Sequence, residues 1–332
     1  MLLDPKLGQL SLCAKFINFF PAKDHPKIAD ILIKERKPHD LLPYLEDFQN
    51  IDRLNILKQL LRVTDLPEFR NITVDIVDYE RENISECIGD NIKQFLDLDH
   101  NQIAEVFIQN NASKYLKFFI TKLKNLNTEV QDSLTNLGAY EIIASSPSSF
   151  KNLNQKEFAI RLINDFAEAR LLFKNFDKFT EVDFQDIIDQ VFKTFDQCQA
   201  DQSKERRSAK DLRILSYPSG LSLLLGEDRR LPEKYALSFC AGSSSNVIFK
   251  TYQDIDNFPI DEAIKIIAQK GEAASLFSDS CPFKDFRIDQ ALVDSIIEGK
   301  GNAPNLIFLD SKFAAFYTEG NISKIIRQGN LS

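Results

Sequence analysis

Between residues 180 and 195, six apolar side chains recur at spacings of three or four positions, and this period decides the fold class of the region. They belong to Phe184, Ile187, Ile188, Val191, Phe192 and Phe195. A stripe with this spacing covers one face of an amphipathic helix, so we predict a helix here. Thr180, followed three residues later by Asp183, has the pattern of a helix start, and we expect Thr180 to be the N-cap.

The same period recurs from about residue 27 to residue 198, which predicts a series of helices. Helices are expected near residues 27–36, 51–62, 83–96 and 112–124. Further starts are indicated by the capping pairs Asp99 with Gln102, Thr128 with Gln131, and Asn154 with Glu157. Short polar connections between consecutive helices favour a multi-helix bundle or an irregular α-solenoid. No ankyrin, tetratricopeptide or leucine-rich signature recurs at its own period.

The pattern changes after a charged segment, residues 201–211, that lacks the large apolar side chains of its neighbours. Beyond it, five short apolar runs bounded by Gly, Pro, Ser and Asn predict strands. These are LRILSY (212–217), LSLLL (221–225), KYALSF (234–239), NVIFKTY (246–252) and NLIFLD (305–310). We expect the third and fourth to form a hairpin with a flexible tip. The predicted fold is mostly α: an all-α domain over 1–200, a charged linker or helix end over 201–211, and a smaller α+β domain over 212–332.

Composition restricts the kinds of partner and compartment. There are 49 acidic and 41 basic residues, with a formal net charge of -8 and an isoelectric point near 5.1. This field repels phosphate, so we expect another protein as partner rather than nucleic acid. No run of about 18 apolar residues predicts a membrane span. The start lacks the pattern of a classical export signal, so we expect a cytoplasmic protein or one delivered to a host cytosol without such a signal.

Cysteine and histidine could form a nucleophilic site. The five cysteines are scattered and lack a CxxC pair, which predicts neither a disulfide framework nor a zinc knot. Cys240 and Cys281 lie in loop-like sequences and are the candidate nucleophiles, although free cysteine is more often a small buried hydrophobe. The histidines, His25, His39 and His100, all precede residue 101, and the alternative for each is a capping role or a place at the surface.

Acidic residues after apolar runs are the other candidate site. Asp254 and Asp256 form a DxD pattern, and Asp310 ends the run at 305–310. Paired carboxylates in such positions can hold a divalent cation on a sugar-nucleotide diphosphate. The same residues also occur as helix caps, which is the alternative interpretation. Two stretches that imitate calcium loops lack the required glycine and bidentate glutamate, and no glycine-rich stretch matches a phosphate-binding loop. We predict no resident cofactor.

Two functions therefore remain open at this point. The first is a protein-interaction module built on the helical array, which would suit a bacterial effector acting in a host cell. The alternative is a metal-dependent glycosyl or other group transferase with Asp254, Asp256 or Asp310 near its site. The sequence leaves undecided whether the chain is an enzyme.

Overall fold

Helices dominate the computed structural model of the chain: they make up 72% of it, strands make up 2%, and the residues that the model describes form no sheet. The described residues are 10–62, 74–200, 208–226, 228–283, 286–299, 307 and 311–327. The prediction of a mostly α fold is confirmed. None of the helices in this described part is long and apolar enough to cross a membrane.

The chain divides into two compact units. Unit 1 comprises residues 1–155 and 177–179, and unit 2 comprises residues 156–176 and 180–332. Residues 201–207 of the predicted linker lie outside the described residues. Ser208 and Asp211 form a capping box at the start of the following helix. The predicted limits 1–200 and 212–332 stay a prediction.

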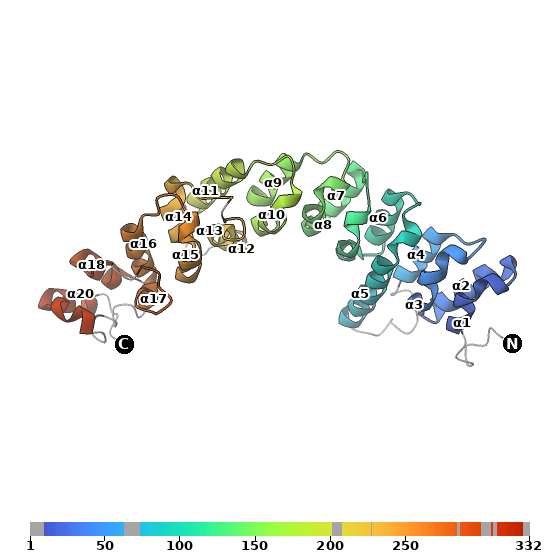
Figure 1. Cartoon of the computed structure of the whole chain (residues 1–332), viewed down its shortest axis with the longest axis horizontal. Coiled ribbons are helices and arrows are strands. Elements are labelled where there is room, and N and C mark those ends of the chain that lie inside the picture. The colour runs from blue at the N-terminus through green and yellow to red at the C-terminus, as the bar shows by residue number, and fades with distance from the viewer. Residues whose placement is uncertain are drawn as a thin grey trace. The chain divides into compact units, whose positions relative to one another are not determined.

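Unit 1 is a series of helices joined by short 3-10 segments (Figure 1). Its helices are α1 (Leu10–Lys15), α2 (His25–Lys34), α3 (Pro38–Leu41), α4 (Arg53–Leu61), α5 (Val74–Asp90), α6 (His100–Gln109), α7 (Thr128–Asn136) and α8 (Tyr140–Ser145). Most of the longer helices pack in series, since α2 contacts α4, α4 contacts α6, and α6 contacts α7, while α5 contacts α3 and α4. The predicted segment 112–124 is two 3-10 helices, Ser113–Phe118 and Ile120–Lys122, rather than one α-helix.

Unit 2 is also a series of helices with short 3-10 segments between some of them (Figure 1). Its helices are α9 (Gln155–Asn164), α10 (Ala169–Asn175), α11 (Phe184–Ala200), α12 (Ala209–Leu215), α13 (Tyr217–Leu221), α14 (Ala236–Gly242), α15 (Ser245–Thr251), α16 (Ile260–Ile267), α17 (Ala273–Leu276), α18 (Gln290–Glu298) and α20 (Glu319–Arg327). Here α14 packs against α16, α16 against α18, and α18 against α20.

Helix α11 confirms the predicted stripe, because five of its six apolar side chains are buried and Phe184 is half-buried. Its start differs from the prediction by three residues. Oδ1 of Asp183 accepts the backbone N–H of Gln185 at 2.7 Å and that of Asp186 at 3.3 Å. Asp183, not Thr180, therefore caps the free amides of the first turn.

Asx residues cap several other helices in the same way. Asp99 caps α6, as predicted, by accepting the N–H of Asn101. Asn127 caps α7 by accepting the N–H of Val130, one residue before the predicted Thr128. Asp52 and Asp289 cap α4 and α18. A loop, an Asx cap and a longer helix thus recur along both units.

The predicted α+β domain is not confirmed, because helices and turns replace the predicted strands wherever those fall on described residues. Residues 212–217, 221–225, 234–239 and 246–252 contribute to α12, α13, α14 and α15 or to the turns beside them. Run 305–310 lies outside the described residues except for Ile307, which is helical and buried. The reason is periodicity: in α14, Ala236, Phe239 and Cys240 are buried while Leu237 is 43% exposed, which is helical spacing. A run of only six residues is too short to distinguish this from a strand.

The expected hairpin tip between α14 and α15 is held by polar contacts. Nζ of Lys270 donates to the carbonyl oxygens of Cys240, at 3.1 Å, and Ser243. The carboxylate of Glu272 accepts the N–H of Ser245 at 2.6 Å. Lys270 and Glu272 belong to a π-turn, Ala268–Glu272, in which Gly271 has a φ of 85° that favours glycine.

Candidate functional site

The predicted DxD pair is part of a structural joint in unit 2. Nε of Arg230 lies 2.7 Å from Oδ1 of Asp256. The backbone N–H of Leu231 donates to the carbonyl of Asp254 at 2.8 Å, and the N–H of Asp256 donates to the carbonyl of Leu231 at 2.9 Å. These contacts form an isolated parallel bridge between Leu231 and Ile255. The motif joins two loops, with one carboxylate already paired to a guanidinium.

No group of three or more His, Cys, Asp or Glu side chains comes together in a way that could hold a metal ion, within the described ranges. Asp310 lies outside those ranges. The prediction of a divalent cation at Asp254, Asp256 or Asp310 stays a prediction.

The candidate nucleophiles Cys240 and Cys281 are both buried, at 0% and 3% exposure. Burial raises the pKa of the Cys240 thiol to about 12, and the charge of Lys270 opposes this only in part. Burial likewise raises the pKa of Cys281, which lies beside a cavity of about 330 Å³. Reactive cysteines instead have a lowered pKa and an accessible sulfur. The surroundings of both residues lend no support to the prediction of catalysis.

Lys270 is a half-buried amine that the sequence did not single out. Burial lowers its pKa, while Glu272, with its carboxylate 3.7 Å from Nζ, raises it. A lysine with a lowered pKa can be a nucleophile. Here Nζ already donates to two backbone carbonyls, so its geometry fits a structural role.

His25 and His100 hold backbone loops in unit 1. Nδ1 of His25 accepts the N–H of Gln49 at 2.9 Å, and Nδ1 of His100 accepts the N–H of Lys124 at 2.9 Å. Each acceptor lies 24 residues before its donor. Each Nε2 lies 3.1 Å from a carbonyl oxygen, that of Phe20 or Leu96, to which it can donate. The capping alternative accounts for both histidines, since each ring accepts a backbone N–H.

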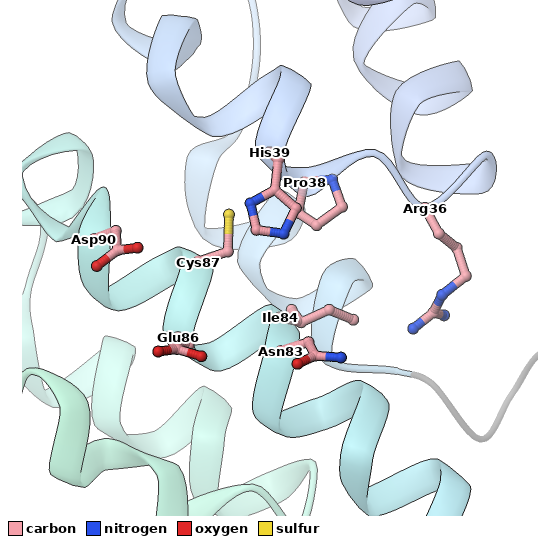
Figure 2. Close-up of a pocket in the computed structure, with 8 residues that line it drawn as sticks. All are labelled: Arg36, Pro38, His39, Asn83, Ile84, Glu86, Cys87 and Asp90. Atoms are coloured by element: carbon pink, nitrogen blue, oxygen red, sulfur yellow. The ribbon is translucent and has the colours of Figure 1, made fainter.

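His39 has different surroundings, because it lies at a cavity of about 420 Å³ between α3 and α5 (Figure 2). The ring of His39 extends from α3 toward Sγ of Cys87 on α5 (Figure 2). Arg36, Pro38 and His39 line one side, and Asn83, Ile84, Glu86, Cys87 and Asp90 line the other. The α5 residues share one helix face, since they recur at spacings of three or four positions.

Backbone geometry explains how the near wall of this cavity forms. Helix α2 ends at Lys34, and Arg36 adopts a φ of 52° that reverses the chain. Lys37 then donates its N–H to the carbonyl of Leu32, and Pro38 begins α3, where its missing N–H is not needed. This turn places His39 over α5.

The cavity combines a buried floor with a charged rim. Pro38, Ile84 and Cys87 are buried, whereas His39, Glu86 and Asp90 are exposed. Burial, with the nearby Asp90 carboxylate, raises the pKa of Cys87 to about 11, so this thiol is protonated at neutral pH. The site can therefore bind a group through its carboxylates, but its thiol is not activated for covalent chemistry.

The polar side chains of the rim are available to a ligand. The side chains of His39, Asn83, Glu86 and Asp90 make no hydrogen bond or ion pair with any residue in the described part of the chain. An adjoining cavity of about 220 Å³ shares Arg36, Pro38 and Ile84 and continues toward the end of α4. The sequence alone could not have indicated this site, because His39 and Glu86 are distant along the chain and no motif links them.

Comparison with known proteins shows no relative: no family model matches the chain, and neither a curated protein nor a solved structure is similar to it.

Proposed function

We propose that this chain binds another protein, and that the cavity between α3 and α5 receives part of that partner. The observation that supports this most directly is the rim of Glu86, Asp90, His39 and Asn83, whose side chains have no partner among the described residues. Two carboxylates one helical turn apart beside an apolar floor favour a cationic side chain with an aliphatic stem. An arginine or lysine of the partner fits both features.

The serial packing of helices supports the same proposal. Each unit, interpreted as an irregular α-solenoid, exposes long faces that repeat proteins use to bind other proteins. The predicted alternative, a metal-dependent transferase, is not favoured by any contact described above, because Asp256 is paired with Arg230. The predictions of an effector role and of a cytosolic location stay predictions.

A selection experiment tests this proposal. Random dodecapeptides displayed on phage are selected on the immobilised full chain, and synthetic versions of the enriched peptides are titrated by fluorescence anisotropy. We expect enriched peptides to carry Arg or Lys, and the double variant Glu86→Lys with Asp90→Lys to bind them at least about tenfold more weakly, which corresponds to about 1.4 kcal/mol.

The matched control is Glu129→Lys with Asp132→Lys, which makes the same charge change at two exposed positions of α7 outside the cavity. This variant should bind like the wild type. If both variants weaken binding equally, the effect comes from net charge and not from the cavity. If Glu86→Lys with Asp90→Lys binds the peptides like the wild type, the cavity is not their binding site.

A further inference from the structure

A second groove in unit 1 lies between the outer faces of α4 and α6 and has a volume of about 350 Å³. Helix α4 with its N-cap contributes Asp52, Leu54, Asn55 and Lys58, and α6 contributes Gln102, Glu105, Val106 and Gln109. The two helices pack against each other, so these residues form two facing walls. No residue of this groove lines the cavity between α3 and α5.

Three amide side chains line this groove. Asn55, Gln102 and Gln109 make no side-chain hydrogen bond with another described residue. By comparison, two other amides of unit 1 bond to the backbone: Asn91 donates to the carbonyl of Cys87, and Asn110 donates to that of Val106. A free side-chain amide offers one acceptor and two donors, which can pair with the N–H and C=O of a peptide backbone.

The spacing of the two glutamines suits an extended chain. Gln102 and Gln109 are seven residues apart on α6, which is about 10.5 Å at about 1.5 Å per residue. Three residues of an extended polypeptide span about 10 Å at about 3.3 Å per residue. Each glutamine can therefore meet a backbone group of the same extended segment.

The charges in the groove indicate what side chains such a segment carries. Lys58 on α4 and Glu105 on α6 are half-buried, and neither forms an ion pair with a described residue. A partner with one acidic and one basic side chain would complement both. Asp52 adds a second carboxylate, so the groove as a whole is acidic and disfavours a nucleic acid.

We propose that the α4–α6 groove binds an extended polypeptide segment, with Gln102 and Gln109 contacting its backbone, and with Lys58 and Glu105 contacting an acidic and a basic side chain of the segment. This proposal concerns a separate surface from the cavity between α3 and α5. Either site can fail its test while the other passes.

Methyl NMR of the full chain tests the groove directly, because Leu54 and Val106 line it and supply methyl signals. The probes are N-acetylated nonapeptide amides of Ser and Gly that carry one Lys and one Glu, separated by one to four positions. We expect at least one separation to shift both methyl signals saturably, with a dissociation constant below about 1 mM. Methylation of the backbone nitrogens between the two charged residues should abolish the shift.

Variants then assign the contacts. The double variant Gln102→Ala with Gln109→Ala should weaken the best peptide at least tenfold, whereas Gln131→Ala, an amide on α7 outside the groove, should leave its affinity unchanged. Glu105→Lys should reverse the preference in favour of a peptide with two acidic residues.

Three results would overturn the proposal: no shift with any peptide of the set, affinity that is insensitive to the double variant, or shifts of the same methyl signals on raising the protein concentration without peptide. The last result would assign the groove to a second copy of this chain.

Discussion

The hydroxyl of Tyr235 donates a hydrogen bond to Oδ1 of Asp189 at 2.5 Å, and this bond fixes the 3-10 helix before α14, Glu233–Tyr235, to the exposed side of α11. The ring of Tyr235 stacks on that of Phe192, with centroids 4.5 Å apart and planes 7° from parallel. Gln185 donates to the same carboxylate oxygen at 2.6 Å. Tyr235 thus bonds to a carboxylate of α11 and also covers part of its buried stripe.

Acid should weaken this contact. The hydrogen bond from Tyr235, followed by those from Gln185 and Lys234, lowers the pKa of Asp189. A carboxyl whose pKa is lower in the folded chain contributes stability above its unfolded pKa, about 3.9, and this stability is lost as the pH falls through the folded pKa. We expect wild type to be more stable than Asp189→Asn at neutral pH in urea denaturation. The difference should begin to shrink below about pH 4 and disappear once the pH is below the lowered pKa of the folded chain. A difference that stays constant with pH would contradict this explanation.

Phe192 lies at the centre of the α11 stripe and is 0% exposed. Replacing it with alanine leaves a cavity among Ile188, Val191 and Phe195 and exposes the face on which Tyr235 stacks. We expect Phe192→Ala to lower the free energy of unfolding by about 3 to 5 kcal/mol. Leu212→Ala, at a side chain that is 60% exposed, is the control and should stay within about 0.5 kcal/mol of wild type. A loss below about 1 kcal/mol for Phe192→Ala would show that the stripe is not a core.

The sequence predicts the long helix α11 but neither the short helix α14 nor the position of the cap of α11. The helix at 184–200 was predictable because its stripe continues over several turns, so that helical and strand periods give different patterns. α14 spans only 236–242, and a short apolar run does not distinguish the two. The cap at Asp183 rather than Thr180 was missed because both residue types cap helices, and packing decides where the first turn starts.

The sites depend on contacts between distant segments. Asp254 and Asp256 matched a metal-binding pattern, but the pairing of Asp256 with Arg230 could not be inferred from local sequence. The cavity beside α5 needs the reversal at Arg36 to place His39 over Cys87. The periodicity of apolar residues does not predict this position of His39, because the position depends on how successive helices pack.

The hydrogen bond from the N–H of Gln49 to His25 should contribute measurably to stability, because His25 is 2% exposed. His25→Phe removes the acceptor and leaves this N–H without a partner, which costs about 1 to 3 kcal/mol. His25→Asn keeps an acceptor near the position of Nδ1 and should lose less. Amide hydrogen exchange gives a direct check: exchange at Gln49 should accelerate in His25→Phe more than in His25→Asn. Equal exchange in wild type and His25→Phe would show that the bond does not protect this loop.

The buried cysteines should resist alkylation in the folded chain. Cys240 and Cys281 are covered and their pKa values are raised, whereas Cys198 is half-exposed on α11. With iodoacetamide at neutral pH, mass spectrometry should find Cys198 modified well before the other two, and all three modified after unfolding in urea. Rapid modification of Cys281 in the folded chain would instead support its prediction as a nucleophile.

Gly299, at the end of α18, passes so close to the π-turn that no side chain fits. A Cβ at this position would lie 2.5 Å from the carbonyl oxygen of Ala268 and 3.2 Å from that of Ile296. Both neighbours are backbone atoms of packed helices, so the clash cannot be relieved by rotating a side chain. We expect Gly299→Ala to destabilise the protein by about 1 to 3 kcal/mol, measured as a lower midpoint of urea denaturation. Gly226→Ala is the matched control, because a Cβ there would meet nothing within 4 Å. If both variants unfold at the wild-type midpoint, α18 and the π-turn are not packed as closely as described here.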